Sequence, residues 1–342
     1  MKPIVNPPNP FESYGCEYFE GMTPPAQLEI YEDQTRSILS GNDSPDLGFR
    51  WSLNPYRGCT HACAYCYARP SHEYLGFGAG TDFETKILIK PKAPELLRET
   101  FMKKSWKGEW IVFSGDTDCY QPLEASYQLT RRCLEVCLEY GNPVGIITKS
   151  FLIVRDLELL KKLHERTRLW VSVSIPFIDD KMARIVEPGA AAVSKRFEAV
   201  QKLAEAGIDV GVGIAPIIPG LNDSDIPAIL KKAKSLGAKS AFRVLIRMPG
   251  HVKEVFIERM KQNFPLRYQK ILGRIRQMHE GKLYRSEFGK RHSGTGEYWN
   301  NVEHIFDSTC EKLGLNQERY REENEKRLPF RRPSLQREFV LD

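Results

Sequence analysis

The chain has 342 residues, of which 41% are hydrophobic, and its 50 Lys and Arg outnumber its 44 Asp and Glu. This length can bury a core without disulfides, either as one α/β barrel or as two domains of about 150 residues each. The net charge of +6 is compatible with a polyanionic partner without requiring one. No stretch approaches the about 18 consecutive apolar residues of a membrane span, and the N-terminus lacks the apolar run of a signal peptide, so we expect no membrane association.

The segment before residue 48 is rich in Pro, Asn and acidic residues and shows little periodicity. It predicts an arm over residues 1–47 that wraps the core, with a short helix near 27–31 and a strand end followed by a turn at 38–45. The remaining pattern divides into a core over 48–250 and a helical C-terminal extension with a basic tail over 251–342. Such a tail can contact nucleic acid, although a solvated charged tail is the commoner outcome.

Three cysteines, Cys59, Cys63 and Cys66, lie close together in an otherwise Cys-poor chain. This spacing indicates metal binding. Three thiolates suit a 4Fe–4S cube, in which each thiolate ligates one iron and the fourth iron stays open. Zinc normally takes a fourth protein ligand, and His61 inside the loop is the available one, although its position there strains the geometry. The remaining cysteines show no paired framework, which indicates a reducing compartment such as the cytoplasm.

From residue 84 to 250 the pattern alternates between short extended runs and helices of about ten to fifteen residues, which predicts parallel βαβ units. Beyond residue 250 the pattern is helical. Residues 50–55 lead directly into the cysteine loop and are predicted to hold the first strand, and the run 86–90 is predicted to be extended. The further predicted strands are 110–114, 144–148, 170–175, 210–215 and 241–247, and the predicted helices are 94–103, 126–140, 152–165, 193–206, 226–236, 252–263, 266–280 and 302–313.

Side-chain parity along the later strands places small and polar residues on one face. Gly211, Gly213 and Ala215 share a face of their strand, and Ser172 and Ser174 share a face of the preceding one. A solid barrel core would be filled by bulky branched side chains. The pattern therefore predicts room for a ligand, and the alternative is that the glycines only accommodate a bulge.

The cysteine loop, with Gly58 before it and Tyr65 and Tyr67 flanking its last cysteine, resembles that of the radical S-adenosylmethionine (SAM) superfamily. Further stretches resemble the group related to spore photoproduct lyase, over roughly residues 30 to 300. The resemblance implies an α/β fold, an open (β/α)6 partial TIM barrel of the radical SAM type. The stretches that carry it are 42–45, 54–59, 68–75, 82–86, 117–122 and 214–223.

The resemblance implies a 4Fe–4S cluster on Cys59, Cys63 and Cys66, with SAM on the open iron. Reductive cleavage of SAM would give a 5′-deoxyadenosyl radical that abstracts hydrogen from an organic substrate. One possible substrate is a nucleic-acid lesion, which the enzyme would repair by lyase-like chemistry. The other possible substrate is a protein or a metabolite. The electron would come from a reductase or a flavodoxin- or ferredoxin-type partner. A zinc-stabilised nucleic-acid-binding module remains the alternative from another class.

The resemblance also assigns SAM-binding roles to residues at the strand ends. The segment beginning at Ser114 takes the place of a Gly-Gly-Glu motif, departing from the two glycines, and its carboxylate would meet the methionyl amino group. An ordinary strand-end turn is the alternative there. The assigned residues are Ser114 and Asp116 for the amino group, Lys149 and Arg196 for the carboxylate, Ser174 for the ribose or carboxylate, the Ala215 backbone for adenine, and Tyr65 as a further SAM-binding residue.

Spore photoproduct lyase passes a hydrogen atom through a cysteine and tyrosines, and three residues here could do so. Tyr65 and Tyr67 are the nearest tyrosines. Phe113 lies near the position of the hydrogen-donating cysteine of spore photoproduct lyase. The nearest thiol is therefore Cys119, in the following loop at the expected mouth of the barrel. The alternative is that Cys119 is a small buried hydrophobic residue. We also expect the turn at 187–189 to shape the site and the Gly-rich segment 289–296 to form a flap over the barrel.

Overall fold

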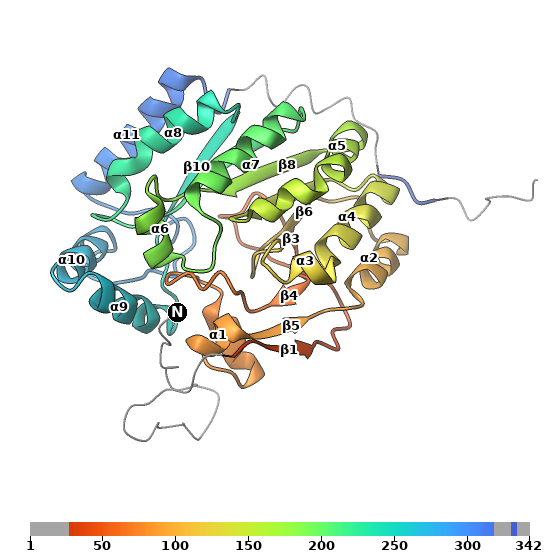
Figure 1. Ribbon diagram of the computed structural model, residues 1–342, viewed down its shortest axis with the longest axis horizontal. Helices are drawn as coiled ribbons and strands as arrows, with labels where there is room; N and C mark the ends of the chain where they lie inside the picture. Colours follow the sequence, from red (N-terminus) through yellow and green to blue (C-terminus); the bar gives the residue numbers. More distant parts are fainter. Residues whose placement is uncertain (1–26, 318–329, 334–342) are drawn as a thin grey trace, which may run out of the picture.

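The computed structural model describes residues 27–317 and 330–333, and its centre is a seven-stranded sheet. Six neighbouring strands run parallel, and β2 pairs antiparallel with the first of them. The sheet order is β10-β9-β8-β7-β6-β3-β2, so β10 and β2 form its two edges and the curved sheet stays open (Figure 1). The strands are β2 (Leu39–Gly41), β3 (Trp51–Leu53), β6 (Ile111–Phe113), β7 (Val144–Thr148), β8 (Leu169–Ser174), β9 (Val210–Ile217) and β10 (Ser240–Leu245).

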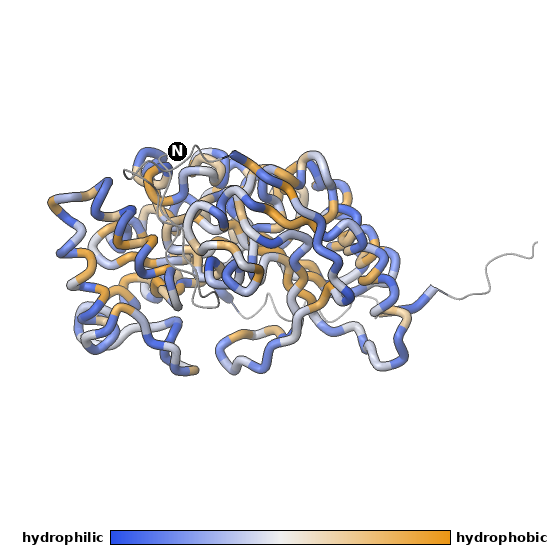
Figure 2. Tube along the Cα trace, turned by 90° about the horizontal axis from the view of Figure 1, so that it is seen from below, coloured by the Kyte–Doolittle hydropathy of each residue, from blue (hydrophilic) through white to orange (hydrophobic). Residues whose placement is uncertain are grey.

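Helices follow the parallel strands and cover the outside of the sheet (Figure 1). Figure 2 shows hydrophobic and hydrophilic residues alternating along the coiled stretches of the chain, as expected of helices with one face on a core. Cys133 and Cys137 lie fully buried on one such face, as small core residues. The helices are α2 (Ala93–Met102), α3 (Glu124–Tyr127), α4 (Leu129–Tyr140), α5 (Leu157–Arg166), α6 (Asp180–Val186), α7 (Val193–Glu205) and α8 (Ile226–Ser235). The predicted open (β/α)6 architecture is confirmed.

A second, three-stranded sheet contains β1 (Glu29–Glu32), β5 (Lys86–Ile89) and β4 (Tyr56–Arg57), with α1 (Thr81–Thr85) beside it. The predicted helix at 27–31 is wrong: the segment pairs parallel with β5, whose ladder satisfies its backbone groups. The run at 86–90 is extended as predicted, yet it belongs to this small sheet. The first parallel strand of the barrel is β3, directly before the cysteine loop, as predicted.

Two predicted helices are interrupted near their starts. The helix expected over 126–140 is divided into α3 and α4 at Gln128, whose φ of 50° is left-handed. The helix expected over 152–165 begins as a 3₁₀ helix, Phe151–Asp156, and continues as α5. The C-terminal helices are present as α9 (Val252–Asn263), α10 (Tyr268–Met278) and α11 (Glu297–Leu313).

The glycines on the inner face of the barrel strands make room for aromatic rings of neighbouring strands, so the space beside them is filled. A Cβ added to Gly213 would lie 2.7 Å from the ring of Phe242, and one added to Gly145 would lie 3.4 Å from the ring of Trp170. The Trp170 and Phe242 rings themselves lie 6.2 Å apart. The predicted cavity is therefore wrong for the level of Gly213, because these rings occupy the space that its missing side chain leaves.

The described part of the basic tail packs on the barrel. Phe330 stacks on Tyr140, and the Arg332 guanidinium donates to the carbonyls of Phe101, Lys103 and Trp106. These hydrogen bonds attach the segment around Arg332 to the barrel. The rest of the predicted tail lies outside the described residues. Over the residues that the structure describes, no helix combines the length and apolar character needed to cross a bilayer.

Candidate active site

The three cysteines of the 59–66 loop lie together, shielded from solvent. Cys59 and Cys63 are buried and Cys66 is partly buried. Burial raises the pKa of the Cys59 thiol well above its usual range, and the neighbouring Cys63 and Cys66 thiolates raise that pKa further. The three thiols of the loop therefore interact electrostatically with one another.

The surroundings of the three thiols fit an iron–sulfur cube. Among residues 27–317 and 330–333, no three His, Cys, Asp or Glu side chains are arranged around a single metal ion. A cube does not require such convergence, because each thiolate binds its own iron. The backbone N–H of Asp118 stabilises the Cys59 thiolate, and that of Ala68 stabilises the Cys66 thiolate. Lys149 lowers the pKa of both Cys63 and Cys66, which compensates negative charge at the centre.

The connection after β6 grips the outer half of the cysteine loop. The Gln121 amide accepts a hydrogen bond from the Thr60 N–H at 3.1 Å and donates one to the Gly58 carbonyl at 3.1 Å. His61 Nδ1 lies 3.3 Å from Asp118 Oδ2. His61, a possible fourth metal ligand by its sequence position, is thus paired with a carboxylate, which holds the loop against the barrel.

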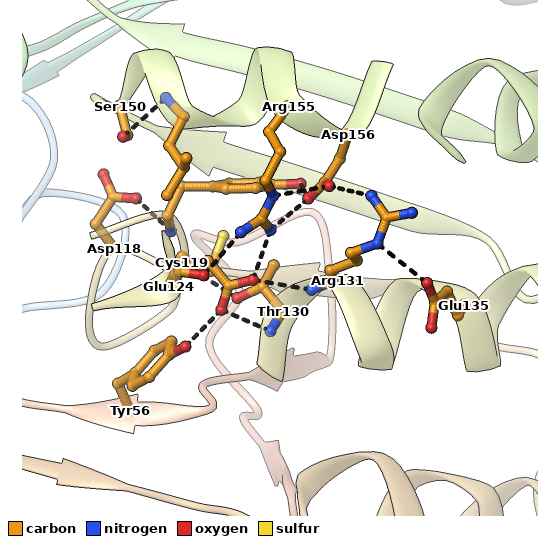
Figure 3. A network of polar contacts seen from close by, with 12 residues as sticks. Tyr56, Asp118, Cys119, Glu124, Thr130, Arg131, Glu135, Ser150, Arg155 and Asp156 are labelled. Atoms are coloured by element: carbon orange, nitrogen blue, oxygen red, sulfur yellow. Dashed lines mark hydrogen bonds and ion pairs between the residues drawn. The ribbon is translucent and has the colours of Figure 1, made fainter. Parts of the chain in front are cut away.

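A buried carboxylate network fixes that connection to the fold (Figure 3). Glu124, fully buried, accepts from the Tyr56 hydroxyl at 2.5 Å and from Arg155 Nη2 at 2.8 Å. Arg155 also pairs with Asp156, which binds Arg131 at 2.6 Å. Because Tyr56 directly precedes the cysteine loop, this network positions the start of the loop as well as the connection that grips it.

The turn between α6 and α7 grips the other half of the loop. The Glu187 carboxylate accepts the Tyr65 hydroxyl through Oε1 and pairs with Arg196 through Oε2 at 2.6 Å. The Gly189 N–H donates to the His61 carbonyl at 3.0 Å. A Cβ at Gly189 would overlap the Thr60 carbonyl oxygen, so only glycine allows this approach. The turn at 187–189 thus shapes the site by direct contact with the cysteine loop.

A buried pair of arginines supports the loop from behind. Arg69 donates to the Cys63 carbonyl at 2.8 Å and pairs with Glu84 at 2.5 Å. Arg259 of α9 binds the same carboxylate at 3.1 Å. Helix α9 belongs to the C-terminal extension, so this extension contributes directly to the support of the cysteine loop.

Two unpaired charges of opposite sign lie beside the last cysteine. Within the described residues, neither the Asp116 carboxylate nor the Lys149 ammonium forms an ion pair. Burial affects the pKa of both side chains. Burial raises the pKa of Asp116, whose Oδ2 accepts from Ser71 Oγ at 3.2 Å. Burial acts to lower the pKa of Lys149, but Cys63 and Glu187 raise it overall. Lys149 and Asp116 shift the Cys66 pKa in opposite directions, so both are near it.

Other predicted site residues are placed as follows. Ser114 has a left-handed φ of 80°, and its hydroxyl accepts from the Cys119 N–H at 2.9 Å. Ser174 is buried at the end of β8, where its carbonyl accepts from Arg196 at 3.2 Å. Since the Arg196 donors are directed to Glu187, Ser174 and Ala191, Arg196 acts here as a brace for the turn. Ala215 lies near the end of β9.

The two hydrogen-relay candidates outside the buried network differ in exposure. Tyr67 is 46% exposed and donates to the Gly115 carbonyl at 2.6 Å. Cys119 is fully buried in the main hydrophobic core, with no exposed surface. The side chain of Cys119 thus points into the core, as in the alternative of a small buried residue, and burial raises the pKa of its thiol well above its usual range.

Comparison with known families identifies the class of this chain. Residues 53–233 match the model of the radical SAM superfamily. This is more than half of the chain, and the protein therefore belongs to the radical SAM superfamily. The fold resembles spore photoproduct lyase complexed with dinucleoside spore photoproduct, with a TM-score of 0.57 and 16% identity over 84% of this chain and 80% of that one.

Two uncharacterized relatives show how far the similarity extends. One, from Mycobacterium tuberculosis, is 38% identical over 178 residues, which are 52% of this chain and 52% of the relative. Another, from Methanocaldococcus jannaschii, is 28% identical over 244 residues, 71% of this chain and 87% of the relative. The matched part thus spans about half the length of the mycobacterial relative.

Several residues that build the site were not predicted from the sequence. Asp118 and Gln121 lie in the stretch 117–122, whose polar residues directly after a strand were a usable signal. The sequence around Arg259 contains no such signal, because a single arginine on an amphipathic helix is typical of a solvated face. Its role depends on a contact with Glu84 across 175 positions of sequence.

Proposed function

We propose that this protein is a radical SAM enzyme that binds a 4Fe–4S cluster through Cys59, Cys63 and Cys66. The observation that carries the proposal is the pair of unpaired charges, Asp116 and Lys149, beside a three-thiol centre. The amino-acid end of SAM carries an ammonium and a carboxylate, which match these two side chains in sign. When bound, such a cluster supplies the electron that cleaves SAM to methionine and a 5′-deoxyadenosyl radical.

The chain's own residues bind and orient SAM in this proposal. Asp116 accepts the methionyl ammonium, and Lys149 binds the carboxylate. Tyr65, locked onto Glu187, forms a fixed apolar wall, while Ser174 and the Ala215 backbone contact the ribose and adenine. Burial of the three thiols keeps water from the reacting centre.

We propose a nucleic-acid lesion as the substrate and Tyr67 as the residue that returns a hydrogen atom to the product. The exposure of Tyr67 and its position directly after Cys66 support this role, and the fold likeness to spore photoproduct lyase supports the substrate class. Electrons would come from a reductase or a flavodoxin- or ferredoxin-type protein in the cytoplasm.

Anaerobic reconstitution tests the radical chemistry. With SAM and dithionite, the reconstituted wild type is expected to form 5′-deoxyadenosine and methionine. Lys149→Ala should weaken SAM binding by about tenfold or more, because a charge-assisted hydrogen bond contributes about 1.5–3 kcal/mol. Lys161→Ala, on the exposed face of α5, is the matched control and should behave as wild type.

Two outcomes separate the parts of this proposal. A fully loaded iron–sulfur protein that forms no 5′-deoxyadenosine would contradict the radical chemistry. Formation of 5′-deoxyadenosine without conversion of a dinucleotide photoproduct to thymine monomers would leave that chemistry intact and remove the lesion as substrate, in favour of a protein or metabolite.

A further inference from the structure

A partly buried arginine, two residues beyond the end of β10, lies beside the tyrosine that follows the last cysteine of the loop. The Arg247 guanidinium carbon lies 5.3 Å from the ring centroid of Tyr67, the residue after Cys66. Tyr67 in turn donates to the Gly115 carbonyl, next to Asp116. Arg247 and Asp116 act in opposite directions on the Tyr67 pKa. Arg247 thus lies at the same mouth of the barrel as the proposed SAM site.

Arg247 has no acidic partner within residues 27–317 and 330–333. Its Nε is buried without a hydrogen bond, and no ion pair includes the guanidinium. In contrast, Arg243, two residues earlier, pairs with Glu303 at 3.0 Å and Asp307 at 2.7 Å. All four buried arginines of the described residues also pair with carboxylates; they are Arg69, Arg196, Arg259 and Arg285.

The side chain that does contact Arg247 cannot neutralise it. Arg247 Nη1 lies 3.0 Å from His292 Nε2. Burial, together with the charges of Arg247 and Arg291, lowers the pKa of His292 to about 4. His292 is therefore neutral at physiological pH and accepts a hydrogen bond from Arg247. A partly desolvated cation without a counter-charge is costly, which is the situation expected of a site that receives an anion from outside.

The segment that carries His292 is anchored on both sides. The Leu245 N–H of β10 donates to the His292 carbonyl at 3.0 Å, and Arg291 pairs with Asp46 at 2.7 Å. The Gly289 N–H also donates to Asp46, at 2.5 Å. The predicted flap over 289–296 is thus tied to the barrel edge and to the loop before β3, which holds the His292 ring in place against Arg247.

We propose that Arg247, oriented by His292, binds a phosphate group of the substrate. This assignment rests on the proposed function, because it places the phosphate next to the residue that follows the cluster. A guanidinium presents paired N–H donors that match phosphate oxygens. The Tyr67 ring beside it offers an apolar face for a planar base, so the two residues together suit a nucleotide with its phosphate still attached.

Phosphate binding can be measured on the reconstituted full chain without SAM or reductant. Inorganic phosphate is titrated by calorimetry at constant ionic strength maintained with chloride. The wild type is expected to bind phosphate, and Arg247→Gln to lose affinity by about tenfold or more, as for a lost charge-assisted hydrogen bond. Arg247→Lys keeps the positive charge but loses the paired N–H donors of the guanidinium, and it should bind phosphate with intermediate affinity. Arg243→Gln is the matched control and should keep wild-type affinity.

A second probe separates phosphate recognition from general affinity for nucleotides. Thymidylyl-thymidine with its natural phosphodiester is compared with the same dinucleotide carrying an uncharged methylphosphonate link. We expect Arg247→Gln to weaken binding of the charged dinucleotide only. Equal loss for both links, unchanged phosphate affinity in Arg247→Gln, or no phosphate binding by the wild type would overturn the assignment. Because no turnover is involved, absence of 5′-deoxyadenosine formation would count against the radical chemistry alone.

Discussion

Replacing Gly189 by alanine is expected to abolish most iron–sulfur incorporation. A Cβ at this position would overlap the Thr60 carbonyl oxygen and lie 3.0 Å from the Thr60 carbonyl carbon and 3.1 Å from the His61 Cα. These are backbone atoms of the loop between Cys59 and Cys63, so no side-chain rotation relieves the overlap. Overpacking of this kind costs about 1–3 kcal/mol, and here the strain falls on the metal ligands.

Iron and sulfide per protein, measured after anaerobic reconstitution, check this expectation. Gly273→Ala is the matched control: a Cβ there, within α10, meets nothing within 4 Å. That control should load as much iron as the wild type. Wild-type iron content in Gly189→Ala would show that the turn at 187–189 does not need to approach the cysteine loop so closely.

Replacing Glu84 by glutamine is expected to lower the free energy of unfolding by about 3–5 kcal/mol. The carboxylate is buried between Arg69 and Arg259, at 2.5 and 3.1 Å, and glutamine has a similar shape without the charge. The change leaves two buried cations without a counter-charge. Burial already lowers the pKa of Arg259, which shows how poorly this site solvates a cation.

Urea denaturation of the apo-protein measures the loss. Glu95→Gln is the control, because Glu95 pairs with Arg132 at 2.9 Å with both side chains about half exposed. An exposed pair of this kind contributes about 0–1 kcal/mol, so the control should stay close to the wild type. Equal stability losses in the two variants would contradict the role of Glu84 as the counter-charge of a buried arginine pair.

The cysteine loop and the strand–helix alternation were predictable because both are local patterns. Cys59, Cys63 and Cys66 lie within one short stretch, and their spacing alone indicates a metal centre. Hydrophobic periodicity likewise predicted five of the six parallel strands. The sixth, β3, has only three residues, Trp51–Leu53, too few for periodicity, and was predicted from its place directly before the cysteine loop.

The errors have a common physical origin in long-range contacts. β1 was predicted as a helix because nothing in its own sequence reveals the partner strand β5, more than fifty positions later. The loop position of Cys119 likewise does not reveal the direction of its side chain, so a thiol that transfers hydrogen and a small buried residue stayed open as alternatives. Arg247 and His292, 45 positions apart, meet only in the folded chain, where the segment that carries His292 packs against β10.

The cysteine loop is held from several directions, and each contact has a different physical basis. Gln121 binds its backbone, Gly189 allows close approach, and Arg69 satisfies the Cys63 carbonyl from within a buried ion-pair cluster. The three thiols are thereby fixed before any cofactor binds. Such preorganisation is what a reactive centre needs, because misplaced ligands are costly in metal affinity and in rate.

The central claim is that three thiolates leave one iron free to bind the amino-acid end of SAM. Electron–nuclear double resonance on the reduced, reconstituted protein with SAM labelled with nitrogen-15 at its amino group tests this directly. We expect a hyperfine coupling between that nitrogen and the cluster. A fully loaded, reduced cluster that shows no coupling to the labelled nitrogen of bound SAM would contradict it.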